Sequence, residues 1–97
     1  MISLSDGRWF DESKAEKFEE ASDWDGSNSI SIATGSQWEH ERMYRTEKGT
    51  WVLNSWSQRQ GTIESYIVYD DDHAARWLSV NNHTHPDLSE ELAELEI

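Results

Sequence analysis

Acidic side chains at helical spacing are the residues of this sequence that could recognise another molecule. Side chains three and four residues apart lie about 5–6 Å from one another on one face of a helix. Asp87, Glu90 and Glu94 have this spacing near the end of the chain. Because successive phosphates of a nucleic-acid strand are spaced at a similar scale, such a row can imitate a short stretch of backbone charge. An ordinary solvated helix face is the alternative interpretation.

Two further groups of carboxylates extend this pattern. One is a row on a helix predicted near the beginning of the chain, and the other is a run of three aspartates at the start of a later helix, where the helix dipole favours negative charge. Together with the first row, the candidate partner-binding residues are Glu12, Glu16, Glu19, Glu20, Asp70, Asp71, Asp72, Asp87, Glu90, Glu91 and Glu94. We expect each to pair with a lysine or arginine of the partner, with a strong dependence on salt.

Other kinds of chemistry have little support in the sequence. His83 and His85 form the one metal-like grouping, but two histidines in a loop are too few ligands for a metal site. The run from Asp70 to Asp72 lacks the glycine and the terminal glutamate of a calcium loop. The sequence has no nucleophile elbow, phosphate-binding loop or dinucleotide-binding fingerprint. We therefore expect no enzymatic activity, no catalytic residues, no metal and no cofactor.

The distribution of charge along the chain supports a binding role. Residues 1–37 carry a net charge of −5, residues 38–69 are neutral, and residues 70–97 carry −7, which gives the total of −12. Such a surface repels nucleic acids and membranes and attracts basic proteins. Adaptation to a salt-rich cytoplasm, or simple solubility, would produce the same excess of acids.

The size and composition indicate one folded domain that spans residues 1–97. Only 35% of the residues are hydrophobic, but the six tryptophans, three tyrosines and two phenylalanines can build a compact core. The chain has no cysteine, which excludes disulfides and a thiol nucleophile. Its first residues lack the features of a signal peptide, and it has no apolar run long enough for a membrane span. We expect a cytoplasmic protein.

The pattern of apolar and turn residues predicts an α+β fold, with an antiparallel β-meander and acidic helices before and after it. The expected order is β-β-α-β-β-β-β-α-α. The elements are a hairpin over 2–10, a helix over 11–21, a loop over 22–29, a strand over 30–33, meander strands over 38–46, 50–57 and 63–69 with a turn over 58–61 between the last two, a helix over 70–80, and a last helix that begins at Pro86. Ala74, Trp77 and Leu78 are expected to point inward.

The register of the first meander hairpin stays open. A two-residue turn at Lys48 and Gly49 would pair Tyr44 with Leu53, whereas a three-residue loop would pair Tyr44 with Val52. Apolar residues occur on both faces of these strands. We therefore expect both faces to be at least partly covered, unless one of them exposes its aromatic side chains to a partner. The neutral charge of this region argues against direct binding of nucleic acid.

The middle of the chain resembles a group of small uncharacterised acidic bacterial and mobile-element proteins. The shared features are a Tyr-Arg-Thr-x-x-Gly-x-Trp hairpin over 44–51, a Trp-Ser-Gln turn over 56–58 and an Ala-Ala-x-Trp-Leu helix over 74–78. This chain departs from the group at Arg59 and Ile63, and the group implies no activity. In size and acidity the chain is also similar to phage-encoded anti-CRISPR and anti-restriction inhibitors.

Two hypotheses follow. In the first, the protein is a non-enzymatic inhibitor or decoy that mimics DNA and occupies the basic nucleic-acid-binding surface of a host defence complex, as a phage or mobile-element protein would. In the second, it is a protein–protein interaction or regulatory module that uses an aromatic sheet face, as a monomer or homodimer, and its acidity serves only solubility.

Overall fold

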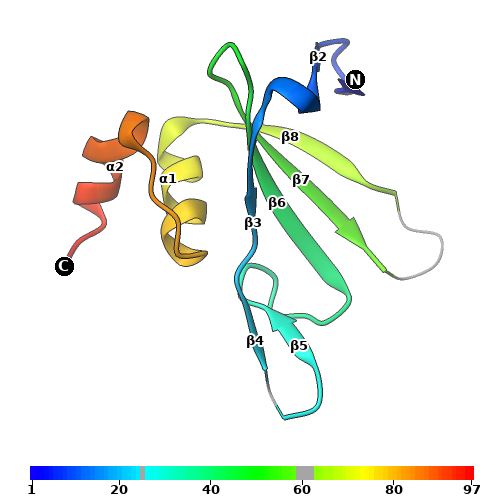
Figure 1. Ribbon diagram of the computed structural model, residues 1–97, viewed down its shortest axis with the longest axis vertical. Helices are drawn as coiled ribbons and strands as arrows, with labels where there is room; N and C mark the ends of the chain where they lie inside the picture. The colour runs from blue at the N-terminus through cyan, green and yellow to red at the C-terminus, as the bar shows by residue number, and fades with distance from the viewer. Residues whose placement is uncertain (25, 59–62) are drawn as a thin grey trace.

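A four-stranded antiparallel sheet is the centre of the computed structural model, which describes residues 1–24, 26–58 and 63–97 (Figure 1). Its strands, in spatial order, are β3 (Glu16–Glu19), β6 (Glu39–Arg45), β7 (Trp51–Ser57) and β8 (Ser65–Tyr69). Two helices, α1 (Asp71–Val80) and α2 (Ser89–Glu94), follow the sheet in sequence. The α+β class and the antiparallel meander predicted from the sequence are therefore confirmed.

Smaller elements complete the fold. They are β1 (Ile2–Ser3), β2 (Trp9–Phe10), the 3-10 helix η1 (Glu12–Lys14), β4 (Ser22–Trp24), β5 (Ser29–Ser31) and the 3-10 helix η2 (Pro86–Leu88). β1 and β2 form the predicted N-terminal hairpin, with Ile2 opposite Phe10. β4 and β5 form a second hairpin, although the sequence predicted only a loop over most of it. Figure 1 shows this second hairpin projecting beyond one end of the sheet.

The prediction of a helix over residues 11–21 is wrong. Asp11 does act as a cap, because its carboxylate accepts a hydrogen bond from the Ser13 N–H, but the helix that follows is one 3-10 turn. The chain then extends as β3 and pairs with β6, which places Phe18 opposite Met43. This pairing satisfies the backbone N–H and C=O groups along the edge of β6 and packs Phe18 against the core. Tertiary contacts of this kind override a weak local helix propensity.

The register of the β6–β7 hairpin follows the three-residue loop. Tyr44 lies opposite Val52, and the loop is closed by a hydrogen bond from the Thr46 N–H to the Thr50 carbonyl (2.9 Å). Gly49 has φ = +90°, a conformation that other residues rarely adopt and that this loop type requires. The next predicted turn, over 58–61, lies almost entirely outside the described residues.

Both faces of the sheet are covered, as expected. On one face, Met43, Trp51 and Leu53 pack against Trp77 and Leu78 of α1. On the opposite face, Tyr44 and Val52 pack against Ile2 and Phe10 of the N-terminal hairpin. The tryptophan and tyrosine at the centre of the sheet are therefore core residues, since Trp51 is 1% exposed and Tyr44 is 3% exposed.

The C-terminal helices match the sequence prediction closely. Asp70 is the N-cap of α1 and accepts a hydrogen bond from the His73 N–H (2.8 Å). Pro86 begins η2, which continues into α2, and Leu88 is buried beneath it. Among the described residues, no helix is both long and apolar enough to cross a membrane.

The packing of α1 on the sheet makes a testable prediction. Leu78 is fully buried in the core between α1 and the sheet, whereas Val80, two residues later, is half exposed. We expect Leu78→Ala to lower the free energy of unfolding by about 2–5 kcal/mol, because it leaves a cavity in a packed core. Urea denaturation measures this change. Val80→Ala is the control and should change stability by less than about 0.5 kcal/mol; equal effects of the two substitutions would contradict the packing described above.

Candidate functional site

Five of the eleven candidate carboxylates are engaged within the fold. Each lies within ion-pair distance of a basic side chain, and three of the partners are histidines. The pairs are Glu16–His85 (3.2 Å), Glu19–Arg42 (3.5 Å), Glu20–His40 (2.5 Å), Asp70–His73 (2.7 Å) and Asp87–Arg45 (2.9 Å). These five acids therefore contribute less free charge to a partner than the sequence alone indicates.

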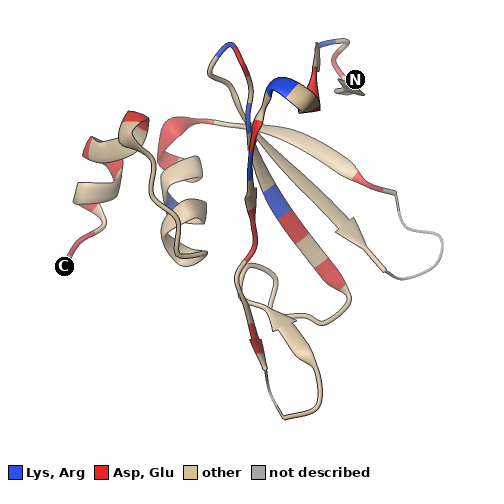
Figure 2. Cartoon of the chain, viewed as in Figure 1, with Lys and Arg blue, Asp and Glu red and all other residues tan. Residues whose placement is uncertain are grey.

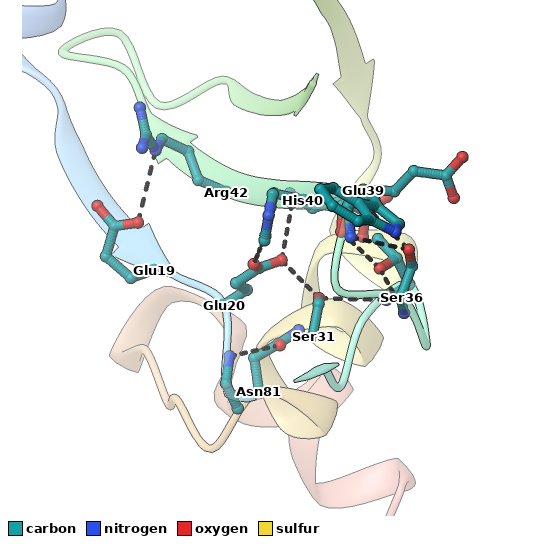
Figure 3. A network of polar contacts seen from close by, with 12 residues as sticks. Glu19, Glu20, Ser31, Ser36, Glu39, His40, Arg42 and Asn81 are labelled. Carbon is teal, nitrogen blue, oxygen red and sulfur yellow. Dashed lines mark hydrogen bonds and ion pairs between the residues drawn. The ribbon is translucent and has the colours of Figure 1, made fainter. Parts of the chain in front are cut away.

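Glu20 lies at the centre of a polar network at the end of β3 (Figure 3). One carboxylate oxygen is 2.5 Å from Nδ1 of His40. The other accepts hydrogen bonds from Oγ of Ser31 (2.6 Å) and from the backbone N–H of Glu41 (2.8 Å). This carboxylate connects β5 to β6 and is half-buried, so its role is structural.

Asn81 attaches the end of α1 to the same region. Its side-chain oxygen accepts a hydrogen bond from the Ala21 N–H (2.9 Å), and its amide nitrogen donates to the carbonyl of Trp77 (2.8 Å). The side chain is 3% exposed and links residues that are sixty positions apart in the sequence. The chain immediately after β3 is therefore fixed to both the sheet and α1.

The two histidines of the metal-like grouping hold the C-terminal loop against β3. Nε2 of His83 donates to the carbonyl of Glu19 (2.7 Å). The Asp87 N–H donates to Nδ1 of His85 (3.1 Å), so that nitrogen carries no proton and Nε2 donates to Glu16. Each histidine contacts a different residue of β3. Within the described part of the chain, no group of three or more histidines and acids is placed to hold a metal ion.

The remaining candidate acids separate into two places. Five of them form what we call the acidic edge, defined as Asp71, Asp72, Glu90, Glu91 and Glu94. α1 and α2 pack against each other, and Figure 2 shows acidic residues at the beginning of α1 and along α2. No residue of the acidic edge forms an ion pair with another described residue. Of the predicted set, these five are the acids that lie on the two packed helices and have no ion-pair partner among the described residues.

Glu12 lies apart from the acidic edge, on η1. It contributes to the electrostatic environment of Tyr66, which belongs to the core on the opposite face of the sheet from the helices. Burial, together with the nearby carboxylate of Glu64 and more weakly Glu12, raises the pKa of Tyr66 to about 12. The predicted row is thus divided, because Glu12 lies on η1 near Tyr66, whereas Glu16 to Glu19 belong to β3, in which alternate side chains point to opposite faces.

Sequence reasoning missed a stack of three side chains on the sheet. The Arg42 guanidinium lies over the indole of Trp56, 4.4 Å from the ring centroid, and the His40 ring stacks on the same indole at 5.6 Å. His40 and Trp56 are cross-strand partners, so this contact could have been predicted once the register was known. The most exposed aromatic side chains, Trp9 and Trp24, lie on the two small hairpins and not on the central sheet. If aromatic side chains bind a partner, the exposed tryptophans of these hairpins are therefore the candidates.

No protein-family model matches this sequence, and no curated protein or solved structure is significantly similar to it. The resemblance to small acidic mobile-element proteins therefore stays a prediction.

The network around Glu20 gives a prediction about stability. Glu20→Ala leaves the Ser31 hydroxyl, the Glu41 N–H and the His40 ring without their shared acceptor. We expect the free energy of unfolding to fall by about 1–3 kcal/mol, the usual cost of unsatisfied buried polar groups. Thermal and urea denaturation measure it. Glu39→Ala removes an exposed carboxylate nearby and should be close to neutral; a neutral Glu20→Ala would show that the network does not stabilise the fold.

Glu41 provides a prediction about pH. Burial raises the pKa of its carboxyl group above 4.5, although a hydrogen bond from Nε1 of Trp77 (3.1 Å) opposes this effect. The folded state therefore holds this proton more tightly than the unfolded state, so the ionised carboxylate lowers stability as the pH rises above 4.5. A glutamine at this position still accepts the indole hydrogen bond and has no charge to bury.

Glu41→Gln should accordingly gain stability relative to the unsubstituted protein as the pH is raised from about 4 to about 7. Urea denaturation of both proteins at several pH values measures the difference between their free energies of unfolding. The other charged groups are the same in both proteins, so their effect largely cancels in this difference. A difference that does not change with pH would contradict the account.

Proposed function

We propose that this protein is a non-enzymatic inhibitor or decoy that binds a basic nucleic-acid-binding surface, as in a host defence complex, through the acidic edge of α1 and α2. The observation that carries this proposal is the contrast between the acids. Those on β3 and in its surroundings are used in internal ion pairs and hydrogen bonds, whereas the five carboxylates of the acidic edge form no ion pair with any described residue.

Local stability explains only part of the acidic edge. Asp71, Asp72, Glu90 and Glu91 lie in the first turns of their helices, where the helix dipole stabilises each by about 0.3–1 kcal/mol. Glu94 is the last residue of α2, where the same dipole disfavours a negative charge. The edge also brings like charges onto two neighbouring helices, which costs free energy that a partner rich in lysine and arginine would recover. Helix stability does not account for Glu94, which is consistent with a binding role.

The expected partner surface is one that normally binds the phosphates of a nucleic acid. Its lysines and arginines would release counterions on binding the acidic edge, as they do on binding DNA, so the affinity should fall steeply with salt. Duplex DNA and this protein would compete for the same groove. Competition shows that both occupy the same basic surface, and charge reversal at defined positions then tests whether the acidic edge is the part that binds.

Charge reversal at the acidic edge tests the proposal. We expect Glu90→Lys combined with Glu94→Lys to weaken capture of a nucleic-acid-binding complex from a lysate of the source organism by at least about tenfold at low salt, since two favourable charge pairs become repulsive. The captured complex should be released by added duplex DNA and by high salt. Binding of the purified complex, measured by biolayer interferometry, then gives the affinities.

The control makes the same change in charge elsewhere. Glu39→Lys combined with Glu47→Lys reverses two exposed acids that do not belong to the acidic edge and should leave capture almost unchanged. Equal loss in both double variants would show that only the total charge matters, and no loss in either would exclude the acidic edge as the binding surface.

The second candidate function is protein–protein interaction through the exposed tryptophans. Trp24 is 68% exposed and Trp9 is 62% exposed, which is unusual for the residue type that most often dominates interface energies. A partner, or a second copy of the chain in a homodimer, that bound these indoles would be retained at high salt. Binding of this partner would be lost in Trp24→Ala or Trp9→Ala and would not change on charge reversal at the acidic edge.

A further inference from the structure

A cavity lies between the N-terminal hairpin, η1 and the turn that joins β6 to β7. Its volume is about 530 Å³, a size that suits a small organic molecule. Val52 and Val68 are part of its lining, and both belong to the core on the face of the sheet opposite the helices. The cavity is therefore on the other side of the sheet from α1 and α2 and is independent of the acidic edge.

Apolar side chains form one part of the cavity lining. Leu4, Phe10, Val52 and Val68 contribute to it, and the exposed indole of Trp9 stands beside them. A hydrocarbon or aromatic group in this cavity would remove apolar surface from water on both sides of the contact, which favours binding. The cavity thus selects for a ligand with an apolar body.

Three basic and two acidic side chains form the other part of the lining. Arg8, Lys14 and Lys48 all contribute to the lining, which is three of the eight lysines and arginines in a chain of net charge −12. Figure 2 shows basic residues at this end of the molecule, on the segments that carry these three side chains. The guanidinium of Arg8 is held by Asp6 (2.7 Å). Lys14 and Lys48, in contrast, form no ion pair with any described residue.

The acids of the lining do not neutralise these lysines by direct contact. Asp11 uses one carboxylate oxygen to bind both the N–H and the hydroxyl of Ser13, which fixes it as the cap of η1. Glu47, the other acid of the lining, is exposed on the β6–β7 turn and forms no ion pair within the described chain. Two ammonium groups beside an apolar cavity are therefore available to a ligand.

We propose that this cavity binds an amphipathic anion, with its apolar body against Phe10, Val52 and Val68 and its carboxylate or phosphate group beside Lys14 and Lys48. The two requirements come from separate features: the lining requires the apolar body, and the unpaired lysines require the negative charge. This inference does not depend on the proposed function, because none of its residues belongs to the acidic edge.

Three ligands of equal chain length separate the two requirements. Octanoate and octyl phosphate carry an anionic head, whereas octanol has the same tail and no charge. We expect the better of the two anions to bind with a millimolar or lower dissociation constant, at least about tenfold tighter than octanol. Tighter binding of octanoate or of octyl phosphate shows whether the cavity prefers a carboxylate or a phosphate head group. Chemical-shift changes in two-dimensional NMR should include the indole N–H of Trp9 and the backbone N–H groups of Lys48 and Thr50.

Substitution of the lysines tests the role of charge. Lys14→Gln combined with Lys48→Gln should weaken the anion by about tenfold, while the affinity for octanol stays the same. Lys17→Gln is the control, because Lys17 lies outside the lining and is within ion-pair distance of Glu19 (3.7 Å). All three are exposed side chains, so the variants should fold.

Three results would overturn the proposal. The first is octanol binding as tightly as the anions, and the second is an anion affinity that the two lysine substitutions do not change. The third is the absence of shift changes around the cavity with either anion at about 10 mM, a concentration that would reveal even a weak site for so small a molecule, and with octanol near its solubility limit.

Discussion

The pairing of β3 with β6 is the constraint on which the rest of this structure depends. It adds a fourth strand to the meander and places Phe18 in the core with Trp51. It also positions Glu16 to meet His85 and presents the Glu19 carbonyl to His83, which fixes the loop before α2. Without this strand, one edge of β6 would be unpaired and the C-terminal segment would lose two of its attachments. Glu16, Glu19 and Glu20 all pair with basic side chains from later parts of the chain, so their charges are compatible with a strand in the sheet.

This pairing also divides the acids into two functional classes. Glu16, Glu19 and Glu20 have partners and stabilise the fold, whereas the carboxylates of the acidic edge have no cationic partner among the described residues. The excess charge of the chain is therefore not spread evenly. Five unpaired carboxylates lie on α1 and α2, while three basic residues line the cavity on the other face of the sheet. The molecule presents two surfaces of different chemistry, and the inferences about each can be tested separately.

Much of the fold could be predicted from the sequence, and the exceptions have physical reasons. The meander, the N-terminal hairpin, the Asp70 cap and the inward face of α1 follow from periodicity and turn chemistry, which are local. The β3 segment misled because its apolar residues also fit a helical pattern, and only the open edge of β6 makes a strand favourable. The pairing of Glu20 with His40 and of Asp87 with Arg45 joins residues far apart in sequence, so no local pattern reports it. The cavity depends in the same way on how the hairpin lies over the sheet.

The state of residues 11–21 tests this account most directly, because both the division of the acids and the position of the acidic edge follow from it. Nuclear Overhauser effects measured on the isotope-labelled protein distinguish the two possibilities. The account predicts cross-strand contacts between Phe18 and Met43 and between Lys17 and Tyr44, with slow amide exchange at alternate residues of β3. A continuous series of contacts between residues three apart from Asp11 to Ala21 would contradict it, because it would show one acidic helix in which these carboxylates share a single face.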